Sequence, residues 1–99
     1  MIIAVNISKT LMEITGEPRA DIAILEIIED AVEHRIEKIS AEIKGLEEKY
    51  SMTFGEFKKR FEAGEIPEAY SYEVETDHLE WEGLVSRLNK YNSLLATHS

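Results

Sequence analysis

The sequence predicts an all-α protein: one helical domain over residues 1–99, paired with a second copy of itself. Three observations lead to this fold class. A long apolar stripe with helical spacing runs through the middle of the chain, a second stripe lies near the C-terminus, and helix-capping residues separate the two. Hydrophobic residues make up 43% of the chain, so its 99 residues can form one core.

The longest element is a helix expected over residues 18–50. Pro18 suits its first turn, and its acidic first half suits the positive end of the helix dipole. Gly45 costs about 1 kcal/mol relative to Ala, but the stripe continues past it. The stripe repeats every three or four residues through Val32, Ile36, Ile39, Ile43, Leu46 and Tyr50. We expect these six residues to be the coiled-coil seam of a homodimer, because the last helix is too short to cover them.

The segment before this helix fits two interpretations. A helix over residues 1–16 would place Ile3, Ile7, Leu11 and Ile14 on one face and would end at Gly16. A strand would instead alternate over residues 2–7, with Ser8 capping a short helix after it. We favour the helix, because its stripe is longer and a lone strand has nothing to pair with in this chain.

A short helix is expected over residues 53–63. Thr53 and Glu56 form a capping box, with Met52 and Phe57 in the staple positions around it. The helix places Phe54, Phe57 and Phe61 on one face, and Gly64 and Pro67 end it.

An acidic connector over residues 65–76 and a last helix over residues 77–96 complete the domain. Asp77 and Glu80 form a weaker capping pattern at the start of that helix. Its apolar stripe comprises Trp81, Leu84, Leu88, Tyr91 and Leu95, so the helix can lie back on the long one.

The charge of the chain is strongly negative and uneven. The net charge is −9, which disfavours binding to nucleic acid or to an anionic membrane. Residues 65–82 contain seven acids and no Lys or Arg, whereas Lys58, Lys59 and Arg60 lie just before them. The plain interpretation is solubility, and the sharper one is a basic protein partner.

Aromatic residues within and beside this acidic run suggest where such a partner would bind. Tyr70, Tyr72 and Trp81 are candidate anchors, since aromatic side chains dominate binding hot spots. Alternatively, Trp81 only anchors the last helix against the long one. The candidate partner-binding residues are Tyr70, Tyr72, Glu73, Glu75, Asp77, Glu80 and Trp81.

The sequence contains no group of residues that indicates a particular reaction, so we expect no enzymatic activity, no cofactor and no metal site. His34 lies one turn from Asp30 and Lys38, which is better explained by a solvated helix face than by a ligand set. The absence of cysteine fits the cytoplasm. The first residues resemble neither a signal peptide nor a membrane span.

Three short motifs resemble a known group of proteins. The stretches EKYSMTFGEF at 48–57, FEAGE at 61–65 and DHLEWE at 77–82 are similar to small helical proteins of archaea and bacteria that are identified as antitoxins of toxin–antitoxin operons. Gly55 departs from the pattern where a helix former is expected, and Ser51 where glycine is common. The resemblance implies a non-enzymatic protein that neutralises a basic toxin by covering it.

Two other functions remain open from the sequence. One is a structural coiled-coil homodimer or assembly adaptor. The other is a ribbon-helix-helix transcriptional regulator, which would need the strand at residues 2–7. In that strand Ala4 and Asn6 would face the DNA groove, and neither is a base-reading Arg or Lys.

Overall fold

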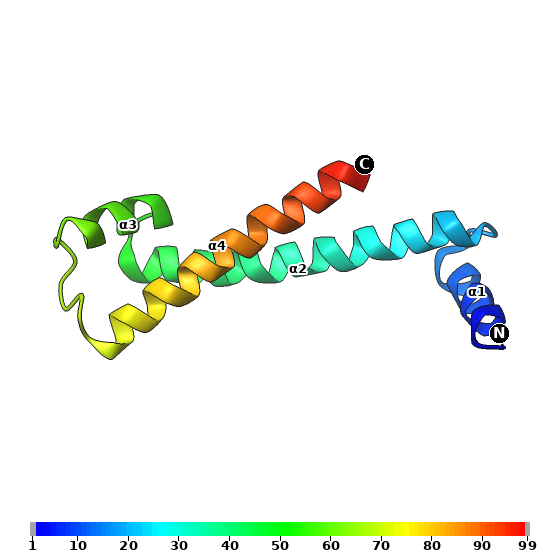
Figure 1. Ribbon diagram of the computed structural model, residues 1–99, viewed down its shortest axis with the longest axis horizontal. Helices are drawn as coiled ribbons and strands as arrows, with labels where there is room; N and C mark the ends of the chain where they lie inside the picture. Colours follow the sequence, from blue (N-terminus) through cyan, green and yellow to red (C-terminus); the bar gives the residue numbers. More distant parts are fainter. Residues whose placement is uncertain (1, 99) are drawn as a thin grey trace.

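Helices account for all regular structure in the part of the chain that the computed structural model describes, which is the backbone of residues 2–98 and the side chains of residues 6–97. They are α1 (Ile2–Thr15), α2 (Ala20–Tyr50), α3 (Phe54–Glu62) and α4 (Tyr72–His98). The molecule is elongated, 58 × 24 × 20 Å, with α2 along its length and α4 returning across it (Figure 1). The all-α prediction is confirmed.

The N-terminal segment is helical, so the strand alternative for residues 2–7 is wrong. The stripe of α1 ends at Gly16, as predicted. The Gly16 amide donates to the Met12 carbonyl at 2.7 Å, and φ of Gly16 is 73°. This left-handed conformation favours glycine, so the chain can turn sharply into α2.

The boundaries of α2 agree with the predicted 18–50 to within two residues, and Gly45 does not interrupt it. Its last turn closes on Ser51, whose φ of 55° lies in the left-handed region. The α3 helix begins where the capping box predicts, since the Thr53 hydroxyl accepts a hydrogen bond from the Glu56 amide at 3.3 Å. The Glu56 carboxylate does not complete the box with the Thr53 amide. It accepts from Arg60 at 2.8 Å instead.

The predicted start of the last helix is wrong. The α4 helix begins at Tyr72, not at residue 77, and the connector therefore spans residues 63–71. Ser71 provides the cap, because its hydroxyl accepts a hydrogen bond from the Val74 amide at 3.2 Å. Asp77 and Glu80 lie inside the helix, where no cap is needed.

The longer α4 also changes the interpretation of the seam. Val32 and Ile39 are buried within one chain, and Ile36, Ile43, Leu46 and Tyr50 are half-buried. Ile43, Leu46 and Tyr50 pack against a core that includes Val74 and Trp81 of α4. The last helix is therefore not too short for residues 32–50, and this part of the stripe gives no reason to expect a second copy.

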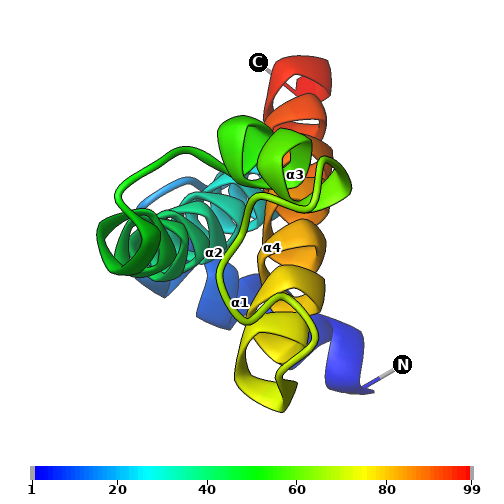
Figure 2. The same ribbon diagram turned by 90° about the vertical axis from the view of Figure 1, so that its left-hand side faces the viewer.

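Figure 1 and Figure 2 together show that α4 crosses α2 obliquely, so it does not follow α2 along its whole length. The main core lies at the end where α2, α3 and the start of α4 meet. It consists of Phe57, Ile66, Val74 and Trp81, and Tyr50, Met52, Phe54 and Phe61 pack around it.

Candidate protein-binding site at the acidic end

The candidate site is the acidic end of the molecule, defined here as residues 46–82: the last turn of α2, α3, the connector and the first three turns of α4. Its scaffold is an aromatic cluster. The ring of Trp81 lies 5.1 Å from Phe57, 5.5 Å from Phe54 and 5.8 Å from Tyr50, centre to centre. Aromatic rings packed in this way stabilise a core by more than the burial of their apolar surface alone would.

Trp81 is fully buried in this cluster. The expectation that it anchors a partner is therefore wrong for this conformation, because no partner can reach the ring. The alternative interpretation, an anchor of the last helix, agrees with its position. The indole nitrogen of Trp81 has no hydrogen-bond partner among the residues that the structure describes, so the ring is held by packing alone.

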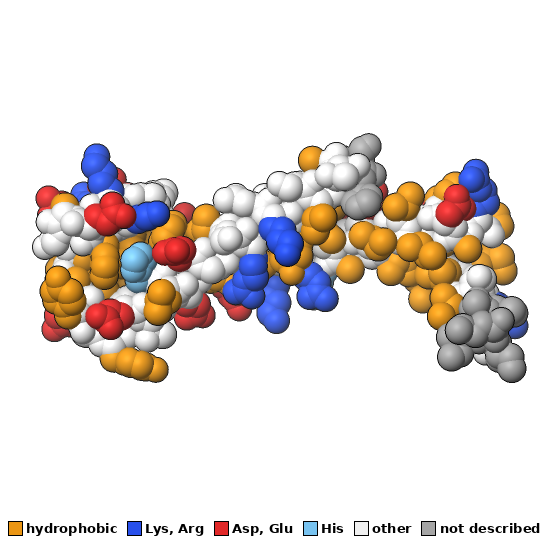
Figure 3. Space-filling model, viewed as in Figure 1, with side chains coloured by type: hydrophobic (Ala, Val, Ile, Leu, Met, Phe, Trp, Pro, Cys, Tyr) orange, Lys and Arg blue, Asp and Glu red, His pale blue; other side chains and the backbone are white. Residues whose placement is uncertain are grey.

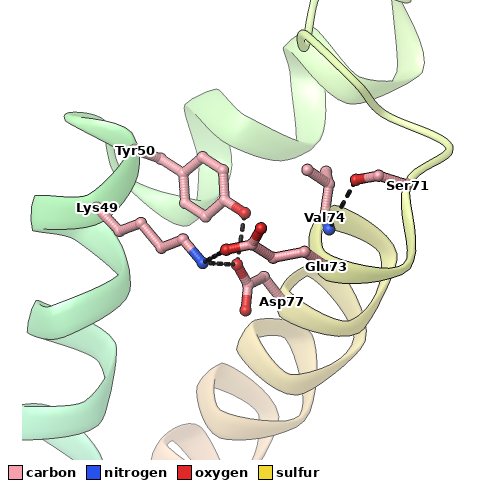
Figure 4. A network of polar contacts seen from close by, with 6 residues as sticks. All are labelled: Lys49, Tyr50, Ser71, Glu73, Val74 and Asp77. Atoms are coloured by element: carbon pink, nitrogen blue, oxygen red, sulfur yellow. Dashed lines mark hydrogen bonds and ion pairs between the residues drawn. The ribbon is translucent and has the colours of Figure 1, made fainter.

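A polar network joins the end of α2 to the start of α4 (Figure 4). The ammonium of Lys49 donates to the Asp77 carboxylate at 2.6 Å and to Glu73 at 2.7 Å. The Tyr50 hydroxyl donates to the same oxygen of Asp77 at 2.5 Å. These contacts span 24 to 28 residues of sequence, so they fix the direction in which α4 leaves the connector.

The network shifts the pKa of each of its central groups. Burial raises the pKa of Asp77, but the hydrogen bonds from Lys49 and Tyr50 outweigh it and leave the pKa below its usual value. Burial, then the hydrogen bond to Asp77, raises the pKa of Tyr50 to about 12. The pKa of Lys49 is raised by its bonds to Asp77 and Glu73. Asp77 is thus a charged structural partner of Lys49, and Glu73 is held by the same ammonium.

The remaining candidates are free on the surface. Tyr70 and Tyr72 are 91% and 85% exposed, and Leu79, which sequence reasoning missed, is 71% exposed. Tyr72 and Leu79 lie seven residues apart, on one face of α4, with Glu75 between them. The only sequence signal for Leu79 is that it falls outside the stripe of Trp81 and Leu84.

The four acids among the candidate partner-binding residues fall into two groups. Glu73 and Asp77 are paired with Lys49. Glu75 and Glu80 are exposed, and the structure records no ion pair for either among the residues it describes. The nearby Arg60 bonds to Glu56 of its own helix rather than to the connector. Figure 3 shows acidic side chains spread among hydrophobic ones over this end of the molecule.

His78 is a second feature that sequence reasoning missed. Its ring lies 4.4 Å from the ring of Phe61 and 5.6 Å from that of Phe57. Its Nε2 is 3.8 Å from the Glu82 carboxylate. The adjacency of Asp77 and His78 in sequence therefore carries no joint chemistry, because the two side chains have different partners.

Neither a metal site nor a membrane span is found in the part of the chain that the structure describes. No group of three or more His, Asp or Glu side chains there is arranged to hold a metal ion. No helix there is both long and apolar enough to cross a membrane.

Comparison with known proteins gives no relative. No protein-family model, curated protein or solved structure matches this chain.

Proposed function

We propose that this chain is a non-enzymatic protein-binding module of the cytoplasm, an antitoxin that covers a basic toxin with its acidic end. The observation that carries the proposal is an exposed surface at this end of the molecule, on which Tyr72, Glu75 and Leu79 share one face of α4. Tyr70 and Glu80, close to them in sequence, are exposed as well. The buried aromatic cluster beneath this face gives it a rigid support.

The chemistry of the face suits a cationic protein. Exposed tyrosines supply large contact areas at a low cost in conformational entropy, and binding hot spots are enriched in them. Unpaired carboxylates around them attract a basic surface over several ångströms and speed the encounter, most strongly at low salt. Lys49 offsets part of the charge of Glu73 and Asp77. The other acids of residues 65–82 repel one another, and a basic surface would relieve that repulsion.

The test measures association with the product of the adjacent reading frame. The doubly neutralised variant Glu75→Gln/Glu80→Gln should bind with a lower association rate and a flatter salt dependence, because steering charges act mainly on the encounter. Tyr70→Ala/Tyr72→Ala should instead raise the dissociation rate, with a loss of about 2 kcal/mol or more in binding free energy.

The matched control is Glu33→Gln/Glu37→Gln, which removes the same charge from an exposed stretch of α2 outside the acidic end. It should leave the association rate close to that of the unaltered chain. Equal slowing in both charge variants would mean that only net charge matters. Unchanged binding in the tyrosine variant would remove the proposed docking face.

A further inference from the structure

A second apolar surface lies at the opposite end of the molecule, on the arm, defined here as residues 6–31 of α1, its turn and the first third of α2. Figure 3 shows hydrophobic side chains gathered over this end. Of the ten large exposed hydrophobic side chains in the described part of the chain, six are in the arm, with exposed fractions of 40–67%. They are Ile7, Met12, Ile14, Ile24, Leu25 and Ile28.

The spacing of these residues is typical of apolar helix faces that pack against another surface. Ile7 and Ile14 lie two turns apart on the stripe of α1, and Ile24 and Ile28 lie one turn apart on α2. Beside Ile7, a shallow hollow of about 270 Å³ is lined by Asn6, Thr10 and Leu11. The α4 helix crosses α2 beyond this region, so none of the helices that the structure describes covers the arm as a third helix (Figure 1).

The chain as a whole exposes more surface than its mass requires. A compact monomer of 11.3 kDa exposes about 5,700 Å², whereas this chain exposes 7269 Å², an excess of about 1,600 Å². Its radius of gyration is 19.5 Å, against about 13 Å for a compact domain of this length. A standard protein interface removes about 800 Å² from each partner, so the excess is large enough to supply one face of a stable dimer.

We propose that the arm is a homodimer interface, in which α1 and the start of α2 pack against the same helices of a second copy. A two-fold interface places each apolar stripe against its own equivalent, so no separate complementary surface is needed. An anionic membrane suits the arm less well, because Asp21, Glu26, Glu29 and Asp30 flank the apolar residues and repel acidic lipids.

Sedimentation of the full-length protein at micromolar concentration tests the proposal. The unaltered chain should be a dimer, and Leu25→Glu/Ile28→Glu should weaken dimerisation by about 100-fold or more, because four charges would enter the apolar contact. The control for position is Leu79→Glu, an equally apolar and more exposed site at the far end, which should remain dimeric. A monomeric unaltered chain, or a dimer equally weakened by Leu79→Glu, would overturn the proposal.

Cross-linking keeps the test decisive if the charged variant does not fold. The chain has no cysteine, so a single introduced thiol reports on one position. A short bismaleimide should convert Ile28→Cys into a covalent dimer and leave Leu79→Cys monomeric on a denaturing gel. Far-ultraviolet circular dichroism and the emission of the buried Trp81 confirm the fold of both variants. The reverse cross-linking pattern would place the contact elsewhere. The result is independent of the proposed toxin, since only the purified chain is present.

Discussion

The acidic end and the arm share one helix, α2, and differ in what covers it. Residues 32–50 of α2, which lead into the acidic end, lie against α4 and α3, and Trp81, Phe57 and Leu84 beside them are almost completely buried. The start of α2 has the same kind of apolar periodicity, yet Leu25 and Ile28 stay exposed. An apolar stripe therefore predicts that a face will be covered, but does not say whether the cover comes from the same chain.

The largest effect on stability is expected from a pair of alanine substitutions on α4, one at a buried side chain and one at an exposed side chain. Trp81→Ala should lower the free energy of unfolding by about 3–5 kcal/mol, because it empties the centre of the aromatic cluster. Leu79→Ala, only two residues away but exposed, should change it by less than about 0.5 kcal/mol. Urea unfolding followed by circular dichroism measures both. Similar losses would mean that the acidic end is not packed around Trp81.

The polar network gives a smaller effect at the same end. Tyr50→Phe removes the hydroxyl that donates to Asp77 and should cost roughly 1.5 kcal/mol, since the acceptor is a charged, partly buried carboxylate. Tyr70→Phe removes an equivalent hydroxyl from a fully solvated ring and serves as the control. If thermal unfolding does not separate the two variants, the bond to Asp77 does not stabilise the acidic end.

The same network makes the stability of the acidic end depend on pH at both extremes. The pKa of Asp77 is lowered by folding, so its contribution is present at neutral pH and is lost as pH falls below about 4. The pKa of Tyr50 is raised to about 12 by folding, so the contribution of its neutral form is lost as pH rises above about 10. The difference in unfolding free energy between the unaltered chain and Tyr50→Phe should be constant between these limits and shrink outside them. A difference that stays constant from pH 3 to pH 11 would contradict this assignment.

The helix cap gives the smallest of these effects. Thr53→Ala should cost about 1 kcal/mol, because the Glu56 amide loses its acceptor at the start of α3. Thr76→Ala, in an exposed turn of α4, should be neutral or slightly stabilising, since alanine is the better helix former. If the melting temperatures of both variants shift in the same direction, the hydrogen bond at Thr53 does not stabilise α3.

Helix ends and apolar helix faces could be predicted from the sequence where the local pattern that marks them is clear. The cap by the Thr53 hydroxyl, the end of α1 at Gly16 and the stripe of Trp81 and Leu84 each depend on neighbours a few residues away, and the structure agrees with them. The start of α4 at Ser71 was not predicted, because no Glu or Gln follows Ser71 at the third position to complete a capping box, whereas Asp77 and Glu80 do form such a pattern and suggested a later start.

Contacts between distant segments could not be predicted in this way. Lys49 and Asp77 are 28 residues apart, and nothing in either local pattern indicates that they meet. The burial of Trp81 follows from three rings contributed by α2 and α3, so its acidic sequence neighbours were misleading. Of the predicted site, Tyr70, Tyr72, Glu75 and Glu80 remain available to a partner, and Asp77 and Trp81 serve the fold instead.

Hydrogen exchange at two protein concentrations tests most directly whether the acidic end is complete within one chain while the arm needs a second copy. Amides of the helical parts of the acidic end, residues 46–62 and 72–82, should be protected to the same degree at nanomolar and at high micromolar concentration, because α2, α3 and α4 of one chain pack together there. Amides of residues 6–31 should exchange much faster when the protein is dilute and become protected as it is concentrated. Protection of the arm that does not change with concentration would contradict the account, and so would protection of the acidic end that rises together with it.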